Sequence, residues 1–174
     1  MTNTSFPESC QEYVPIYEHL LAENLSLLLD RHDQRPDYPF IDTKLSLISG
    51  EDFEERSRGS DIYSRDIVYG WIQARGLEAL AEHLVWIPRA QYLDAQRKNA
   101  LEGRSKHLLA TVLEAVESLR QINHARLSFM LSTSGTPLKV ANDGSLTPLG
   151  RIPGDASFSD LFCAKGLYPA GRAL

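Results

Sequence analysis

Residues 69–81, Tyr-Gly-Trp-Ile-Gln-Ala-Arg-Gly-Leu-Glu-Ala-Leu-Ala, form the segment that most constrains the fold. Apolar and small residues recur there at helical spacing on several sides and continue to Trp86, so the predicted helix leaves little surface for water. The exceptions, Arg75, Glu78 and Glu82, line up along one side. On a buried helix such charges must be paired or face a wet cavity. Alternatively, these three charged residues form the solvent-exposed face of an amphipathic helix, and their spacing fits either interpretation.

The composition is typical of one soluble globular domain over residues 1–174, with 43% hydrophobic and 24% charged residues. A net charge of −5, with no basic run longer than Arg97-Lys98, argues against a nucleic-acid partner. Cys10 and Cys163 provide neither metal-ligand spacing nor a disulfide framework. The N-terminal residues lack the apolar region of a signal peptide, and no apolar stretch of the chain is long enough to span a membrane. We therefore expect a cytoplasmic protein without a membrane partner.

Hydrophobic spacing predicts four helical segments separated by two long irregular ones. The first begins near Ser9 and stops before Asp33, and the second is capped by Ser60 or Asp61 and ended by Pro88. Between these two helices the chain is predicted to be mostly loop.

The third helix is predicted over residues 90–126, with a weak point at Gly103. Residues 127–131 and 137–140 then predict a small β-hairpin, and residues 142–144 predict a second tight turn. A last helix starts at Phe158 and is interrupted by Pro169. Because nothing follows to cover its apolar face, we expect an incomplete fold. The alternative is a compact four-helix domain in which this segment docks onto the first three helices.

Several short motifs occur in a fixed order between residues 40 and 166. They are an Asp-Thr-Lys loop (Asp42, Thr43, Lys44), a Trp-x-Gln-x-Arg helix (Trp71, Gln73, Arg75), a Ser-x-x-Gly-x-Pro-Leu hairpin and a Phe-Ser-Asp-x-Phe helix start (Phe158, Ser159, Asp160, Phe162). This order resembles the N-acylglucosamine 2-epimerase family of sugar epimerases and isomerases.

The resemblance implies an all-α fold, an (α/α)6 barrel of six helical hairpins around a sugar pocket, with a small β-hairpin between helices. Four helices occupy this whole chain, so twelve would need at least about twice its length. The chain would thus be the N-terminal part of such a barrel. No residue matches the family's proton-transfer histidines, so the catalytic residues stay unassigned. The five histidines present are better explained as surface or packing residues.

The substrate-binding residues implied by the resemblance begin with Arg75, whose planar guanidinium can donate to sugar oxygens. Its alternative role is an ion pair with Glu78 or Asp160. The Gln73 amide would hydrogen-bond hydroxyl groups, and the Trp71 indole would stack on a sugar, although a helical tryptophan is more often in the core.

Three further residues belong to the predicted pocket border. Asp160 replaces the family's more usual glutamate, which shortens its reach. Lys44 and Asp42 lie in the loop expected beside the pocket, with a loop ion pair as the favoured alternative.

The reaction implied by the resemblance moves a proton at the carbon next to a sugar carbonyl through an enediol-like intermediate. It needs no cofactor and no metal. The expected partner is a small-molecule sugar, and a homodimer stays open. Because the proton-transfer histidines are missing, we predict little or no isomerase activity for the 174-residue chain alone.

Two other functional classes stay open. A glycoside hydrolase on a helical toroid would need two carboxylates across the pocket, for which Asp42 and Asp160 are the candidates. A non-catalytic helical interaction module would instead present a large exposed apolar patch.

Overall fold

The computed structural model describes residues 8–46, 48–53, 62–64, 66–152 and 154–174. Its helices are α1 (Glu8–Gln11), α2 (Val14–Asp33), α3 (Gly70–Trp86), α4 (Ala95–Ile122) and α5 (Phe158–Ala173), with a 3₁₀ turn at Ile87–Arg89. Its strands are β1 (Ile67–Tyr69), β2 (Met130–Ser132), β3 (Pro137–Val140) and β4 (Leu146–Pro148). The strands form one antiparallel sheet in the order β1-β2-β3-β4.

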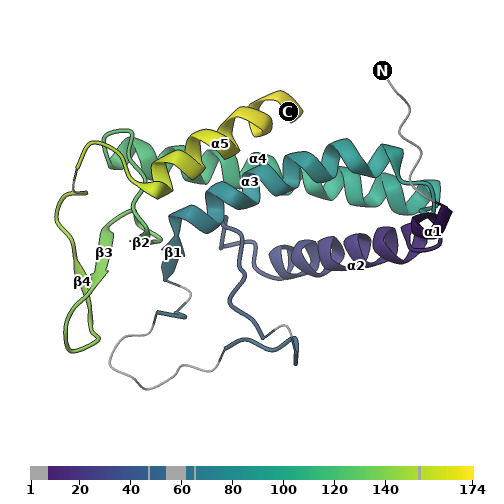
Figure 1. The fold of residues 1–174 in the computed structure, drawn as a ribbon. Helices are drawn as coiled ribbons and strands as arrows, with labels where there is room; N and C mark the ends of the chain where they lie inside the picture. The colour runs from purple at the N-terminus through teal and green to yellow at the C-terminus, as the bar shows by residue number, and fades with distance from the viewer. Residues whose placement is uncertain (1–7, 47, 54–61, 65, 153) are drawn as a thin grey trace.

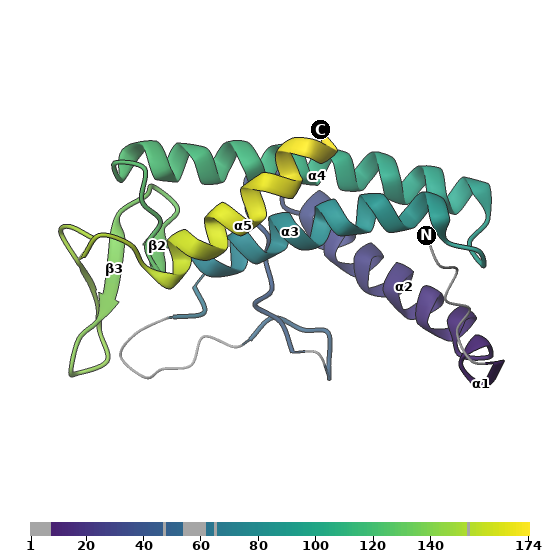
Figure 2. The same ribbon diagram turned by 45° about the horizontal axis from the view of Figure 1, so that its top comes forward.

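Helix α3 is the centre of the helical layer and packs most extensively against α5 and then against α4, while α2 packs against α4. The two ribbon views show α2 at one edge and the sheet at the end of the molecule where α3 and α5 begin (Figure 1 and Figure 2). The core is aliphatic, and its most deeply buried large side chains include Leu29, Val68, Leu77, Leu80, Ile87, Leu108, Leu109, Val112, Val116, Leu127 and Leu131.

The helices begin and end at recognisable sequence signals. The Asp94 carboxylate accepts from the backbone N–H of Arg97 at 2.7 Å and caps α4, and Ser157 and Asp160 form a capping box at the start of α5. Pro88 lies in the 3₁₀ turn that ends α3, as predicted.

The prediction of an all-α (α/α)6 barrel is wrong, because the chain has a mixed fold in which a four-stranded antiparallel sheet accompanies the helices. The helical spacing of residues 70–86 extended the predicted helix backwards over β1. Yet Ile67, Val68 and Tyr69 are β-branched or aromatic residues that favour strands. They pair with β2, far away in sequence, and this pairing decides their conformation.

Gly70 joins β1 to α3 at a point where two backbones meet. Its N–H donates to the Phe129 carbonyl at 3.0 Å, and a Cβ at this position would lie 2.3 Å from the Ser128 carbonyl oxygen. No larger residue fits there without moving the chain that leads into β2. The close approach links the start of α3 to the sheet.

The remaining predictions had mixed outcomes. The hairpin is confirmed as β2 and β3, and the second turn connects β3 to β4; Gly135 and Gly144 have positive φ angles of 91° and 85° in these turns. Helix α4 continues through Gly103, and α5 continues through Pro169. The proposed caps Ser60 and Asp61 lie outside the described residues.

The first helix is divided, since α1 contains Ser9 while α2 begins after Tyr13 with Pro15 in its first turn. Within the described residues, no helix combines the length and the apolar character needed to cross a membrane.

Candidate functional site

An open groove lies between α2, α3 and the segment at residues 41–43, and we call it the Arg75 groove. It has a volume of about 470 Å³, which is within the usual range for small-molecule sites. Its lining residues are Asn24, Leu25, Leu28, Ile41, Thr43, Trp71, Ile72, Arg75, Gly76, Ala79, Leu80 and His83.

Arg75 is the cation in this lining and is 55% exposed. Its Nε lies 3.7 Å from a carboxylate oxygen of Glu78, and its guanidinium lies 5.5 Å from the centre of the Phe162 ring. Glu78 has a second partner, because Lys165 approaches its other oxygen to 2.9 Å. The charged line of α3 is therefore partly exposed to solvent, and Glu82 is exposed as well.

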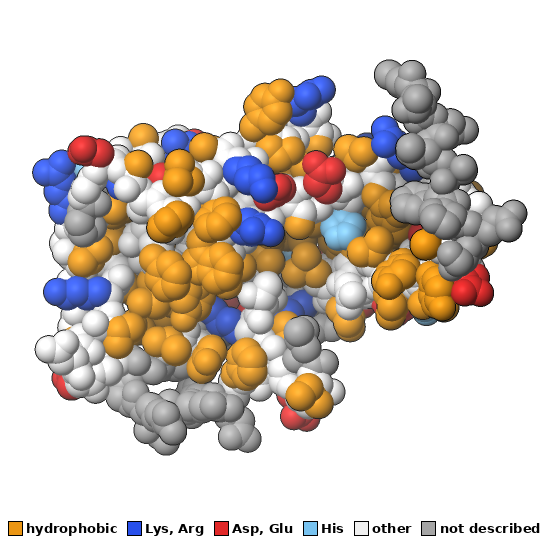
Figure 3. Space-filling model, in the orientation of Figure 1, with side chains coloured by type: hydrophobic (Ala, Val, Ile, Leu, Met, Phe, Trp, Pro, Cys, Tyr) orange, Lys and Arg blue, Asp and Glu red, His pale blue; other side chains and the backbone are white. Residues whose placement is uncertain are grey.

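Several aromatic rings lie close together near the start of α3, and Trp71 among them also lines the Arg75 groove. The ring planes of Trp71 and Phe129 are 12° apart with centroids separated by 6.4 Å, and Tyr69 meets Phe129 edge-on at 5.8 Å. Phe129 is 57% exposed, and Phe158 on α5 is 80% exposed. Figure 3 shows a large group of hydrophobic side chains over the starts of α3 and α5.

His83 is the titratable group of the groove two helical turns beyond Arg75. Its ring lies edge-on to Trp86 with a centroid distance of 5.8 Å. Burial lowers the pKa of His83 below the ordinary histidine value, because desolvation disfavours the imidazolium. At neutral pH the ring is therefore uncharged.

The structure brings Arg75 and Trp71 together in the groove and places Gln73 on the other side of α3. Gln73 is 2% exposed, and its amide accepts from the Ile41 N–H at 2.7 Å and donates to the Ile41 carbonyl at 2.9 Å. Both amide atoms are thus used to hold Ile41, which belongs to the groove wall. Through these two hydrogen bonds Gln73 positions the part of the groove wall that contains Ile41.

Lys44 and Asp42 belong to a separate polar cluster. The Lys44 ammonium donates to the carbonyl oxygens of Ser64 and Ile67. Asp42 is 7% exposed and forms ion pairs with Arg31, at 2.9 Å, and with Arg35. Both side chains therefore fix the loop that contains Thr43.

Asp160 is held at the start of α5. It accepts from the backbone N–H of Leu127 at 2.8 Å, from the backbone N–H of Ser157 at 2.8 Å and from Nε of Arg126 at 2.9 Å. Burial alone would raise the pKa of Asp160, but these hydrogen bonds outweigh it and lower the pKa below the ordinary aspartate value. The hydrogen bonds from Arg126 and Leu127 to Asp160 connect the start of α5 to the segment that leads into β2.

We expect Asp160→Asn to lower the free energy of unfolding by about 2 kcal/mol at pH 7, because hydrogen bonds to a charged carboxylate are lost. The folded-state pKa is below the unfolded one, so this stabilisation is complete above the unfolded pKa and disappears as the pH falls through the folded pKa. Denaturant unfolding of both proteins across the acid range would measure it. A difference independent of pH would contradict the assignment.

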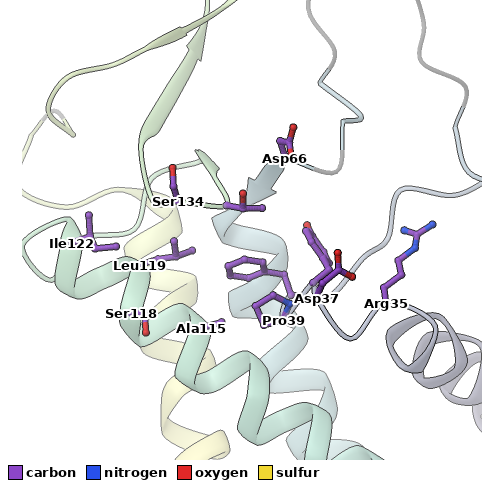
Figure 4. A pocket seen from close by; sticks show the side chains of 12 residues that line it. Arg35, Asp37, Pro39, Asp66, Ala115, Ser118, Leu119, Ile122 and Ser134 are labelled. Carbon is purple, nitrogen blue, oxygen red and sulfur yellow. The ribbon is translucent and has the colours of Figure 1, made fainter.

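A second cavity, of about 520 Å³, lies between α4, residues 35–40 and the turn from β2 to β3. Figure 4 shows Ala115, Leu119 and Ile122 of α4 along one side of this cavity, with Asp37 and Asp66 on the other side. Burial raises the pKa of Tyr38, which also lines this cavity. None of the predicted substrate-binding residues lines it.

The described residues contain no cluster of three or more histidine, cysteine or acidic side chains suited to a metal ion. Burial raises the pKa of the Cys163 thiol to about 11, so this cysteine is not an activated nucleophile. Comparisons of the chain with protein-family models, curated proteins and solved structures found no match.

Proposed function

We propose that the Arg75 groove binds a sugar and that the chain supplies part of the pocket of a sugar epimerase or isomerase. The observation that supports this most directly is the placement of Arg75 and Trp71 in one groove with a neutral histidine, His83. Sugars present hydroxyl and carbonyl oxygens at their edges and C–H groups on their faces. A guanidinium donates to the oxygens, and aromatic rings pack against the C–H groups.

Each groove residue suits one task in such a reaction. The Arg75 guanidinium stabilises negative charge that develops on the carbonyl oxygen, and it keeps its own charge throughout. His83 accepts a proton from the neighbouring carbon and returns it. The two residues are about 12 Å apart along the helix axis, so their side chains must converge on a sugar from two turns of α3.

The hydrolase alternative has less support. Asp42 is neutralised by two arginines and Asp160 is occupied in the capping box, so neither carboxylate is free to face the other across the Arg75 groove. A glycosidase needs two carboxyl groups about 5–9.5 Å apart beside the substrate.

Sugar binding to the 174-residue chain tests the proposal directly. We expect saturation-transfer NMR to detect binding of N-acylhexosamines or of mannose, glucose or fructose. Arg75→Ala should abolish the signal and Arg75→Lys should weaken it, because an ammonium cannot reproduce the guanidinium fork. Since Glu78 keeps Lys165 as a partner, both variants should remain folded. Arg172→Ala is the matched control, because Arg172 is an exposed arginine of α5 outside the groove.

The chemical step is measured separately by following exchange of the proton beside the sugar carbonyl in D₂O. We expect slow exchange that His83→Gln removes, and little or no net isomerisation, because the open groove does not exclude water. Sugar binding that is unchanged in Arg75→Ala, or no binding of any of these sugars, would overturn the proposal. Rapid turnover that survives His83→Gln would show that the proton-transfer residue lies elsewhere.

A further inference from the structure

The second cavity is bounded by segments that hydrogen bonds fix to one another. The backbone N–H of Thr133 donates to the carbonyl of Asp66 at 2.9 Å. The Asn123 amide donates to the carbonyls of Leu119 at 2.9 Å and Gly135 at 2.8 Å, which attaches the turn from β2 to β3 to the end of α4. The cavity therefore exists before any ligand binds, as is usual for small-molecule sites.

The side of the second cavity that α4 supplies is mainly apolar (Figure 4). Leu119 and Phe40 form buried parts of the lining, with exposed fractions of 2% and 4%. Ile122, in contrast, is 60% exposed although its side chain is aliphatic. A ligand that covers Ile122 removes apolar surface from water, so this side favours a hydrocarbon group.

The opposite side of the second cavity is negatively charged. Asp37 and Asp66 lie there, and both are exposed. Neither carboxylate forms an ion pair with any residue that the structure describes. The cation of the lining is Arg35, and its guanidinium is already shared between Asp42 and Asp52. The two carboxylates of the cavity therefore have room for a positively charged ligand.

The polar neighbours of these carboxylates do not take the place of such a ligand. Burial is the main cause of the raised pKa of Tyr38, and the charges of Asp42 and Asp66 add to it, so the phenol is neutral at pH 7. The Lys44 ammonium does not line the cavity and donates to the carbonyl oxygens of Ser64 and Ile67.

We propose that the second cavity binds a small primary amine, with its ammonium group beside Asp37 and Asp66 and its hydrocarbon body against α4. An ammonium has three N–H donors and no acceptor, so it suits carboxylates together with the hydroxyl groups of Thr133 and Ser134, which also line the cavity. An anionic ligand would be repelled by both aspartates.

A metal ion is a poorer match than an amine. One side of the cavity is apolar, whereas hard cations need six or more oxygen ligands around them. The part of the chain that the structure describes also holds no group of three or more metal-ligating side chains. The proposal does not depend on sugar binding, because the second cavity and the Arg75 groove share no lining residue.

NMR titration of the 174-residue chain with phenethylamine measures both binding and its place. We expect saturable shifts of the backbone amides of Ala115, Thr133 and Ser134, without comparable shifts at Gly76 or Ala79 of the Arg75 groove. Phenethyl alcohol has the same hydrocarbon body without the positive charge. It should bind at least about tenfold more weakly, because it cannot form charge-assisted hydrogen bonds with the aspartates.

Two charge-removing variants test the assignment of the carboxylates. Asp37→Asn and Asp66→Asn should each weaken phenethylamine binding by at least about tenfold, and both should keep the Tm of the unchanged protein because these side chains are exposed. Asp143→Asn is the matched control, since Asp143 is an exposed aspartate of the turn between β3 and β4, outside the cavity. It should leave the affinity unchanged.

Four results would overturn the proposal. They are no saturable binding of phenethylamine, equal binding of phenethyl alcohol, unchanged affinity in both Asp37→Asn and Asp66→Asn, and amide shifts centred on the Arg75 groove. The last result would place the amine in the groove instead of the second cavity.

Discussion

Gly166→Ala is expected to lower the free energy of unfolding by about 3 kcal/mol, although alanine is the better helix former. A Cβ at this position of α5 would lie 2.1 Å from the carbonyl oxygen of Ala74 on α3 and 3.0 Å from its carbonyl carbon. Both atoms belong to a helix backbone, so neither can rotate away. The two helices must move apart, and this loosens the largest helix contact of the molecule.

Thermal unfolding would measure the effect as a decrease in Tm of about 6–12 °C for a domain of this size. The control is Gly171→Ala, another substitution in α5, where a Cβ meets no atom within 4 Å. Gly171→Ala should leave the stability unchanged or raise it by up to about 1 kcal/mol. Equal stabilities for the two variants would show that α5 does not pack on α3 at this distance.

The sequence was sufficient to predict the body of α3 and its C-terminal end, but not its start, because the body and the C-terminal end depend on local patterns. Ala74, Leu77, Ala81 and Leu84 recur at helical spacing, and all four are buried. The charged line on the same helix could not be placed from spacing alone. Whether Arg75 is buried depends on which neighbours cover it, and the neighbours come from α2 and α5.

The full four-stranded sheet could not be predicted beyond the hairpin of β2 and β3, because its strands contain only three or four residues and β1 depends on a distant partner. Ile67 pairs with Ser132, and no local signal fixes this register. The strand-forming sequence of β1 was visible, but the longer helical pattern that follows it was stronger. Pro169 shows the opposite failure, since packing of α5 overrides a local helix-breaking residue.

The candidate site shows why a linear motif is an incomplete guide. Residues two apart on a helix point about 200° apart, so Gln73 turns away from the groove that Trp71 and Arg75 face. The row spaced by four residues, which runs Trp71, Arg75, Ala79 and His83, identifies the groove side of α3. Following this row would have singled out His83 among the five histidines.

Asp42→Asn is the second substitution with a large expected effect, because it removes the negative charge beside Arg31 and Arg35. These arginines are only 14% and 17% exposed, and without Asp42 their remaining carboxylate partner among the described residues is Asp52. Removing one member of a buried ion pair costs about 3–5 kcal/mol when the opposite charge is left unpaired, and the remaining partner Asp52 places Asp42→Asn at the lower end of this range. The Asp42 carboxylate also accepts from the Lys44 N–H at 3.0 Å, and the amide oxygen of an asparagine keeps this loop hydrogen bond, so the variant removes mainly the charge.

Denaturant unfolding of Asp42→Asn should therefore show a loss of at least about 3 kcal/mol. Glu23→Gln is the matched control, because Glu23 is 50% exposed and its ion pair with Arg97 should contribute less than about 1 kcal/mol. Asp42 adjoins Ile41 and Thr43, which line the Arg75 groove, so Asp42→Asn should also weaken sugar binding while Glu23→Gln leaves it unchanged. Equal losses of stability in the two variants would contradict the buried network, and unchanged sugar binding in Asp42→Asn would show that the groove does not depend on this loop.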